Sequence, residues 1–87
     1  MDSIEEREKW LNLHFFIKPE IVQCLGNLNV EKRKDFVGLS YNNQKVLLPT
    51  IFDGITLVNS TMACVSFEGK YGFYDVYLEK WIIEPLC

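Results

Sequence analysis

Short apolar runs separated by closely spaced turn signals are the feature that most constrains how this chain can fold. From Asp35 onward, turn-forming residues recur at 42–44, 53–54, 59–61 and 68–70. The runs between them are rich in Val, Ile, Phe and Tyr, which favour strands. This part of the chain therefore predicts five or six short antiparallel strands in a strongly bent sheet or a small barrel of SH3-like size.

The expected strands are the runs 36–41, 45–48, 50–52, 55–58, 62–67 and 71–78, with 79–84 either continuing the last run past a bend or forming a further short strand. Pro49 cannot donate a backbone hydrogen bond, so it should end its strand or place that strand at an edge. Asp53-Gly54 is a tight-turn signal between two of the runs.

The first 34 residues carry helix signals instead. Ser3 and Glu6 form a capping box ahead of apolar residues at helical spacing, which predicts a helix from about residue 4 to 16. Over 11–17 an alternation of apolar and polar residues would also fit a strand. Pro19 suits the start of a second helix and Gly26 its end, which predicts a short helix at about 19–26.

Together these signals predict an α+β fold in one domain over 1–87. Two short N-terminal helices would be followed by one five- to six-stranded antiparallel sheet or small barrel. No internal repeat, linker or low-complexity stretch is apparent in the sequence.

Composition limits the classes of function. The chain is 48% hydrophobic with a net charge of −3, which is typical of a globular protein and unfavourable for binding duplex nucleic acid. No apolar run is long enough to span a membrane, and the acidic N-terminus does not resemble a signal peptide. Three cysteines, at positions 24, 64 and 87, are read as free thiols, which predicts the cytoplasm of the source cell or of a host cell.

Catalytic and metal-binding patterns are sparse. His14 is the single histidine, no Cys/His cluster has the spacing of a metal site, and no glycine-rich loop could hold a phosphate. An enzyme would need His14, Asp75 and a cysteine to line one cleft. We therefore expect no enzyme activity, no cofactor and no metal.

The most informative stretch is 71–83, which is rich in aromatic residues. A continuous strand would carry apolar side chains on both faces, whereas a strand at the surface should be polar on one of them. Either the rest of the fold covers both faces, or one face is an interface. Tyr and Trp are frequent in binding hot spots. The candidate partner-binding residues are Tyr71, Tyr74, Asp75, Tyr77 and Trp81.

The preferred interpretation is thus a small regulatory or inhibitory protein, of the kind that phages and mobile elements encode, which contacts another protein or a second copy of itself. The alternative is a small-barrel protein that binds single-stranded nucleic acid through stacked aromatic rings. That alternative would rely on the basic cluster Lys32, Arg33 and Lys34, which stands between Glu31 and Asp35. Such short charge runs are more often solvated turns.

Overall fold

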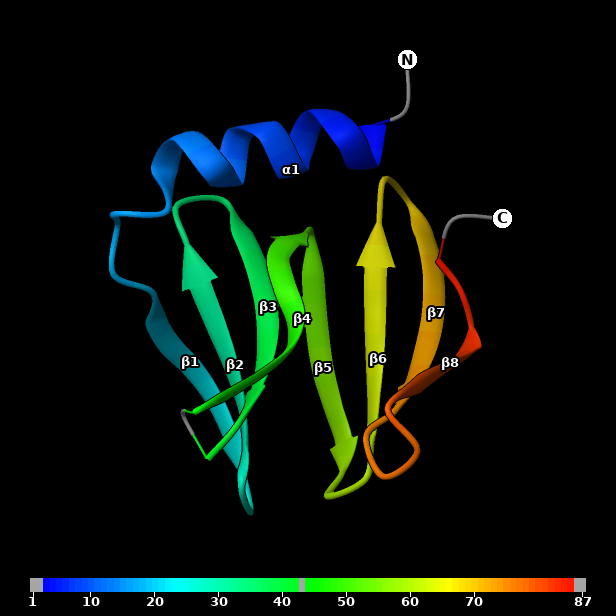
Figure 1. Cartoon of the computed structure of the whole chain (residues 1–87). Helices are drawn as coiled ribbons and strands as arrows, with labels where there is room; N and C mark the ends of the chain where they lie inside the picture. Colours follow the sequence, from blue (N-terminus) through cyan, green and yellow to red (C-terminus); the bar gives the residue numbers. More distant parts are fainter. Residues whose placement is uncertain (1–2, 43, 86–87) are drawn as a thin grey trace.

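A computed structural model describes residues 3–42 and 44–85 of the chain, without the side chain of Ser3. Within these residues the chain forms one helix and eight strands, and the strands make two four-stranded antiparallel sheets. The first sheet has the order β1-β2-β3-β4 and the second the order β5-β6-β7-β8. Helix α1 lies across one end of both sheets (Figure 1).

The elements are, in chain order, α1 (Ser3–His14), β1 (Glu20–Leu25), β2 (Leu28–Arg33), β3 (Phe36–Tyr41), β4 (Lys45–Phe52), β5 (Gly54–Asn59), β6 (Met62–Phe67), β7 (Lys70–Asp75) and β8 (Lys80–Ile83).

The predicted fold class is wrong, because a mostly β structure with one helix replaces two helices and a single sheet. The first predicted helix is present and ends at His14. The second is strand β1, which pairs with β2 across a two-residue turn that contains Gly26 at a φ of 61°. β-branched Ile21 and Val22 suit a strand, and the pairing with β2 satisfies backbone groups that a helix would have paired internally.

Of the two outcomes predicted for Pro49, the second is confirmed, because β4 runs through Pro49 and lies at an edge of its sheet. The turn after β4 differs from expectation. Asp53-Gly54 does not join two paired strands, because β4 and β5 belong to different sheets. Asp53 is the single residue between them, and its amide donates to the carbonyl oxygen of Ser66 at 3.0 Å. The tight turn therefore carries the chain from one sheet to the other.

The second sheet repeats the first at a constant displacement along the chain. β1, β2 and β3 begin at residues 20, 28 and 36, while β5, β6 and β7 begin at 54, 62 and 70, so each strand is displaced by 34 residues. The pairing follows the same displacement, since Leu28 lies opposite Tyr41 in the first sheet and Met62 lies opposite Asp75 in the second.

A hydrogen bond outside the strand ladders is repeated as well. The amide of Asn42 donates to the carbonyl oxygen of Asn27 at 2.8 Å, and the amide of Val76 donates to that of Thr61 at 2.9 Å. Both residues of the second bond are displaced by 34 from those of the first. The chain is therefore a tandem pair of one four-stranded meander, although no repeat was expected from the sequence.

The two meanders pack face to face. β5 packs across β1, β2 and β3, and the side-chain amide of Gln23 in β1 bonds both to the carbonyl oxygen of Ile55 and to the amide of Leu57, at 2.7 and 3.3 Å. Gln23 thus acts as a backbone mimic along the edge of β5. Side chains of α1, of the first sheet and of the second form one buried cluster: Leu11, Leu28, Val30, Val37, Leu39, Leu48, Ile51, Phe52, Ile55, Ala63, Val65, Phe67 and Tyr74.

Candidate functional site

The turn Val76–Glu79 divides the predicted aromatic stretch into two strands. Glu79 has a φ of 53°, and after it β8 runs back along β7. Trp81 therefore lies opposite Tyr74 and shares its face of the sheet, rather than the face of Tyr71 as a continuous strand would require.

The predicted binding residues thus fall into three places. Tyr74 and Trp81 point into the core, where their ring centroids lie 5.2 Å apart, and Tyr74 is only 5% exposed. Tyr71 and Asp75 lie on the opposite face of β7. Tyr77 lies in the turn before β8 and is 83% exposed. The structure therefore brings the five residues to one region of the second sheet but not to one surface.

Burial and charge both act on Tyr74. Burial raises the pKa of its hydroxyl, and the nearby carboxylates of Glu79 and Asp75 raise it further. Tyr74 therefore stays neutral over the ordinary pH range and packs as an apolar ring with a polar tip.

The outer face of the second sheet is an apolar surface, and it includes Tyr71 of the predicted residues. Cross-strand pairing places Cys64 opposite Phe73, and Phe73 opposite Ile83, so these side chains share one face. Tyr71 and Ile83 are 70% and 54% exposed, and the others are half-buried. We define the outer face by Met62, Cys64, Tyr71, Phe73 and Ile83.

The corresponding face of the first sheet is covered. Subtracting 34 from Met62, Cys64 and Phe73 gives Leu28, Val30 and Leu39, which are at most 1% exposed. They lie in the core on the sheet that β5 crosses. The equivalent faces of the two meanders therefore differ: the face of the first sheet is buried, and the face of the second is partly exposed to solvent.

Strand alternation in the sequence puts Phe73 and Ile83 on the face of Tyr71, but only Tyr71 was selected as a binding residue of this face. Met62 and Cys64, on the neighbouring strand, were missed. A signal was present in β6, where Met62, Cys64 and Ser66 alternate with Ala63, Val65 and Phe67. The second set is buried and the first half-buried, as the alternation of a strand requires.

Asp75 lies at the end of β7, next to the turn that leads to β8. Its Oδ1 accepts a hydrogen bond from the amide of Leu78 at 2.9 Å. The carboxylate that sequence analysis singled out thus caps the turn before β8.

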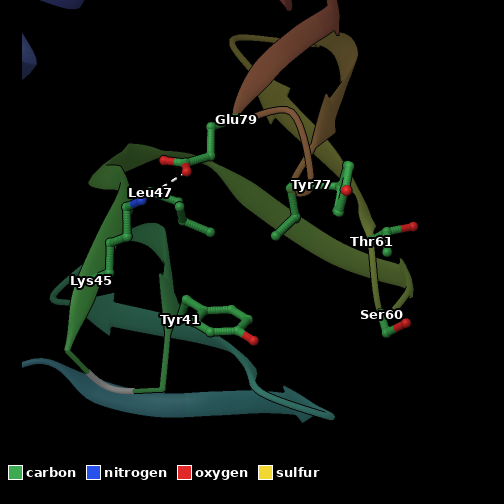
Figure 2. A pocket seen from close by; sticks show the side chains of 8 residues that line it. Tyr41, Lys45, Leu47, Ser60, Thr61, Tyr77 and Glu79 are labelled. Atoms are coloured by element: carbon green, nitrogen blue, oxygen red, sulfur yellow. Dashed lines mark hydrogen bonds and ion pairs between the residues drawn. The ribbon is translucent and has the colours of Figure 1, made fainter.

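A cleft of about 350 Å³ opens between the two meanders (Figure 2). The turns that contribute to its lining lie at the end of the molecule opposite to α1 (Figure 1). Lys45 from the first meander and Glu79 from the second form an ion pair across it, with 2.7 Å between Nζ and Oε2. The lining residues are Tyr41, Lys45, Leu47, Ser60, Thr61, Val76, Tyr77 and Glu79. His14, Asp75, Cys24 and Cys64 are not among them, so the cleft does not hold the side chains that sequence analysis required of an enzyme.

The basic cluster does not form a single cationic surface. Lys32 and Lys34 are exposed, and Lys34 sits in the turn before β3 with a φ of 58°. Arg33 is buried and points the other way: its Nε donates to the carbonyl oxygen of Ile17 and its Nη1 to Oγ1 of Thr50, both at 2.7 Å. Its guanidinium therefore serves the fold rather than a phosphate.

Residues 3–42 and 44–85 contain no group of three His, Cys, Asp or Glu side chains that could hold a metal ion. The same residues contain no helix long and apolar enough to cross a membrane. Cys24 and Cys64 are free thiols, while Cys87 lies outside the described residues. Comparison of the chain with protein-family models, with curated proteins and with solved structures finds no match.

Proposed function

We propose that this chain is a non-catalytic binding module that docks a protein partner on the outer face of its second sheet. The observation that carries the proposal is the contrast between equivalent positions. Leu28, Val30 and Leu39 are buried under β5, whereas Met62, Cys64 and Phe73 are half-buried and no strand of the described residues packs across them. Exposed apolar faces of this kind mark interaction sites.

The chemistry of the face supports a protein rather than a nucleic acid. Tyr71, Phe73 and Ile83 combine aromatic and aliphatic area, which suits a dry protein interface. Single-stranded nucleic acid would need cations along the rings. The exposed lysines of the basic cluster lie on β2 and its turn, in the other sheet. On the outer face, Lys80 lies opposite the carboxylate of Asp75, so this part of the face is not a cationic track.

The free thiols of Cys24 and Cys64 fit a reducing compartment, and we place the activity in the cytoplasm on that ground. The module would act by occupying a surface of its partner, as regulators and inhibitors do. This role needs no pocket with convergent catalytic groups.

Site-specific photo-cross-linking in the source cell tests the proposal. A benzoylphenylalanine at position 71 should give a covalent protein adduct, and the same residue at position 46 should not, because Val46 is exposed in the first sheet, away from the outer face. Adding Ile83→Lys to the position 71 variant should abolish the adduct, since it places a charge in the interface. Equal adducts from both positions, or none from position 71, would contradict the proposal.

A further inference from the structure

We infer that the cleft between the two meanders binds a free aromatic amino acid, whose carboxylate pairs with Lys45 and whose ammonium group pairs with Glu79. The cleft shares no lining residue with the outer face, so this inference goes beyond the proposed function and does not depend on it. It rests on a turn in which the second meander departs from the first, on the charges of the cleft, and on its walls and volume.

The turn before β8 is longer than the fold of a meander requires. In the first meander Tyr41 pairs with Lys45, four positions further along the chain, whereas in the second Asp75 pairs with Lys80, five positions further. Glu79, the last residue of the longer turn, has a φ of 53°, which is unfavourable for a residue with a side chain. Because the first meander reverses with one residue fewer, the longer turn and its strained position indicate a role at the cleft.

Lys45 and Glu79 place opposite charges at one end of the cleft (Figure 2). Their ion pair spans 2.7 Å between Nζ and Oε2, and the two side chains are 57% and 46% exposed. An exposed pair of this kind contributes little to stability, so a ligand can open it without unfolding the protein. A ligand with both an ammonium group and a carboxylate replaces one ion pair by two, whereas a ligand with a single charge pairs with only one of the side chains. The charges therefore favour a zwitterion.

The walls of the cleft are apolar and aromatic, and both meanders contribute to them. Leu47 from the first meander and Val76 from the second pack against the core, and Tyr41 and Tyr77 add one aromatic ring from each meander. An aromatic ring of the ligand would pack on the aliphatic side chains and against a tyrosine ring. The side-chain amide of Asn27 donates to the hydroxyl oxygen of Tyr41 at 3.2 Å, so the hydroxyl hydrogen of Tyr41 can still be donated to the ligand.

The volume of the cleft limits the size of the ligand. Its 350 Å³ lies near the lower end of the range for small-molecule sites, which is about 300–1,000 Å³. A single amino acid suits such a volume. A residue inside a protein chain carries neither the free ammonium group nor the free carboxylate that Glu79 and Lys45 would bind. The cleft therefore suits a free amino acid better than a segment of a protein.

Isothermal titration calorimetry of the full chain with L-tryptophan tests the inference. A ligand of this size should bind with a dissociation constant on the order of 0.1–1 mM. Tryptamine lacks the carboxylate and 3-indolepropionate lacks the ammonium group, so each should bind about tenfold more weakly. L-leucine lacks the ring and should bind several-fold more weakly. Equal binding of L-tryptophan and any of these three compounds, or no binding of L-tryptophan up to about 10 mM, would overturn the inference.

Substitutions in the chain test the two charges separately. Lys45→Met and Glu79→Gln should each weaken the binding of L-tryptophan about tenfold and leave the urea midpoint of unfolding nearly unchanged, because their exposed ion pair contributes little to stability. The matched control is Lys80→Met, an exposed lysine next to Glu79 that does not line the cleft, and it should bind like the wild type. Unchanged binding in Lys45→Met or Glu79→Gln, or an equal loss in Lys80→Met, would contradict the assigned contacts.

Amide chemical shifts of the isotope-labelled wild type locate the ligand without any substitution. The ring current of bound L-tryptophan should shift the amide signals of Leu47, Thr61, Val76 and Tyr77, which line the cleft, and leave that of Tyr71 on the outer face unchanged. Shifts confined to another surface would show that the cleft is not the site. The proposed docking function would survive that result, because it concerns the outer face alone.

Discussion

Alanine at Gly38 or Gly72 should destabilise this protein more than any other addition of a single methyl group. The two glycines occupy equivalent positions of the two meanders. At both, the backbone of another segment passes close to the glycine Cα. A Cβ at Gly38 would lie 2.6 Å from the carbonyl oxygen of Leu48. At Gly72 it would meet the carbonyl oxygen of Ile83 and lie 2.6 Å from the nitrogen of Pro85.

The obstructing atoms at both glycines belong to the backbone, so a rotamer change cannot relieve the contact. We expect each substitution to lower the free energy of unfolding by about 3 kcal/mol or more, since overpacking in a well-packed interior costs 1–3 kcal/mol and occasionally more. A domain of this size has only about 5–15 kcal/mol in total, so the double variant should not fold.

Gly54→Ala is the matched control for these substitutions. Its nearest neighbour would be Oγ of Ser66 at 2.9 Å, and that hydroxyl can rotate away. Urea unfolding followed by tryptophan fluorescence measures all three variants. A loss at Gly38 and Gly72 no larger than the loss at Gly54 would mean that the crossing strands are not packed as described.

Arg7→Ala should produce the second large effect, because Arg7 joins the helix to both sheets. Its Nη1 donates to the carbonyl oxygen of Ile51 at 2.8 Å and lies 2.9 Å from Oδ1 of Asp53, the residue between the sheets. Its guanidinium lies 4.6 and 4.2 Å from the ring centroids of Phe36 and Phe67, one from each sheet. Losing these contacts should lower the free energy of unfolding by about 2–4 kcal/mol.

Arg7→Lys separates charge from geometry at this position, and Lys9→Ala is the matched control. Arg7→Lys retains the charge without the planar fork, so it should recover only part of the loss. Lys9→Ala, an exposed change in the same helix, should be nearly neutral. Chemical denaturation of the three variants provides the comparison. Equal effects of Arg7→Ala and Lys9→Ala would contradict the role given to Arg7.

Acid should weaken the same contact. Partial burial alone would raise the pKa of Asp53, but the hydrogen bond from the amide of Glu68 and the guanidinium of Arg7 outweigh it and hold the pKa below its ordinary 3.8. Because the folded-state pKa is the lower one, this stabilisation is fully present above pH 3.8 and is lost as the pH falls through the folded value. Arg7→Ala should therefore show a shallower loss of stability below pH 4.

Most of the strands after Asp35 were predictable because the turns between them, apart from Val76–Glu79, contain typical turn-forming residues. The predicted runs 36–41 and 62–67 are β3 and β6 without change of bounds. The segment 19–26 was not, because its apolar spacing fits a helix face and a strand alike, and the pairing of β1 with β2 decides between them. Local pattern alone contains no information on that partner.

The tandem repeat was hidden because equivalent positions rarely carry the same residue, and only some of them share apolar character. Leu28, Val30 and Leu39 correspond to Met62, Cys64 and Phe73. Both residues of each pair are apolar, but they are not the same residue type. Gly38 and Gly72 are an exception, since a backbone crossing permits no side chain at that position.

The candidate site was predictable only in part. Tyr71 follows directly from strand alternation, as the exposed face of β7 requires. Trp81 was assigned to the wrong face because the turn Val76–Glu79 contains neither Gly nor Asn, even at Glu79, which adopts a positive φ. No residue in that turn is typical of a reversal of the chain.

The most direct measurement on the docking face is the alkylation rate of Cys64 inside the source cell, compared with that of the purified chain at high dilution. Cys24, an exposed thiol in the first sheet, serves as the internal reference. If a protein covers the outer face, Cys64 should react several-fold more slowly in the cell while Cys24 keeps its rate. Equal rates for Cys64 in the two settings would show that the face is open in the working protein and would contradict the docking account.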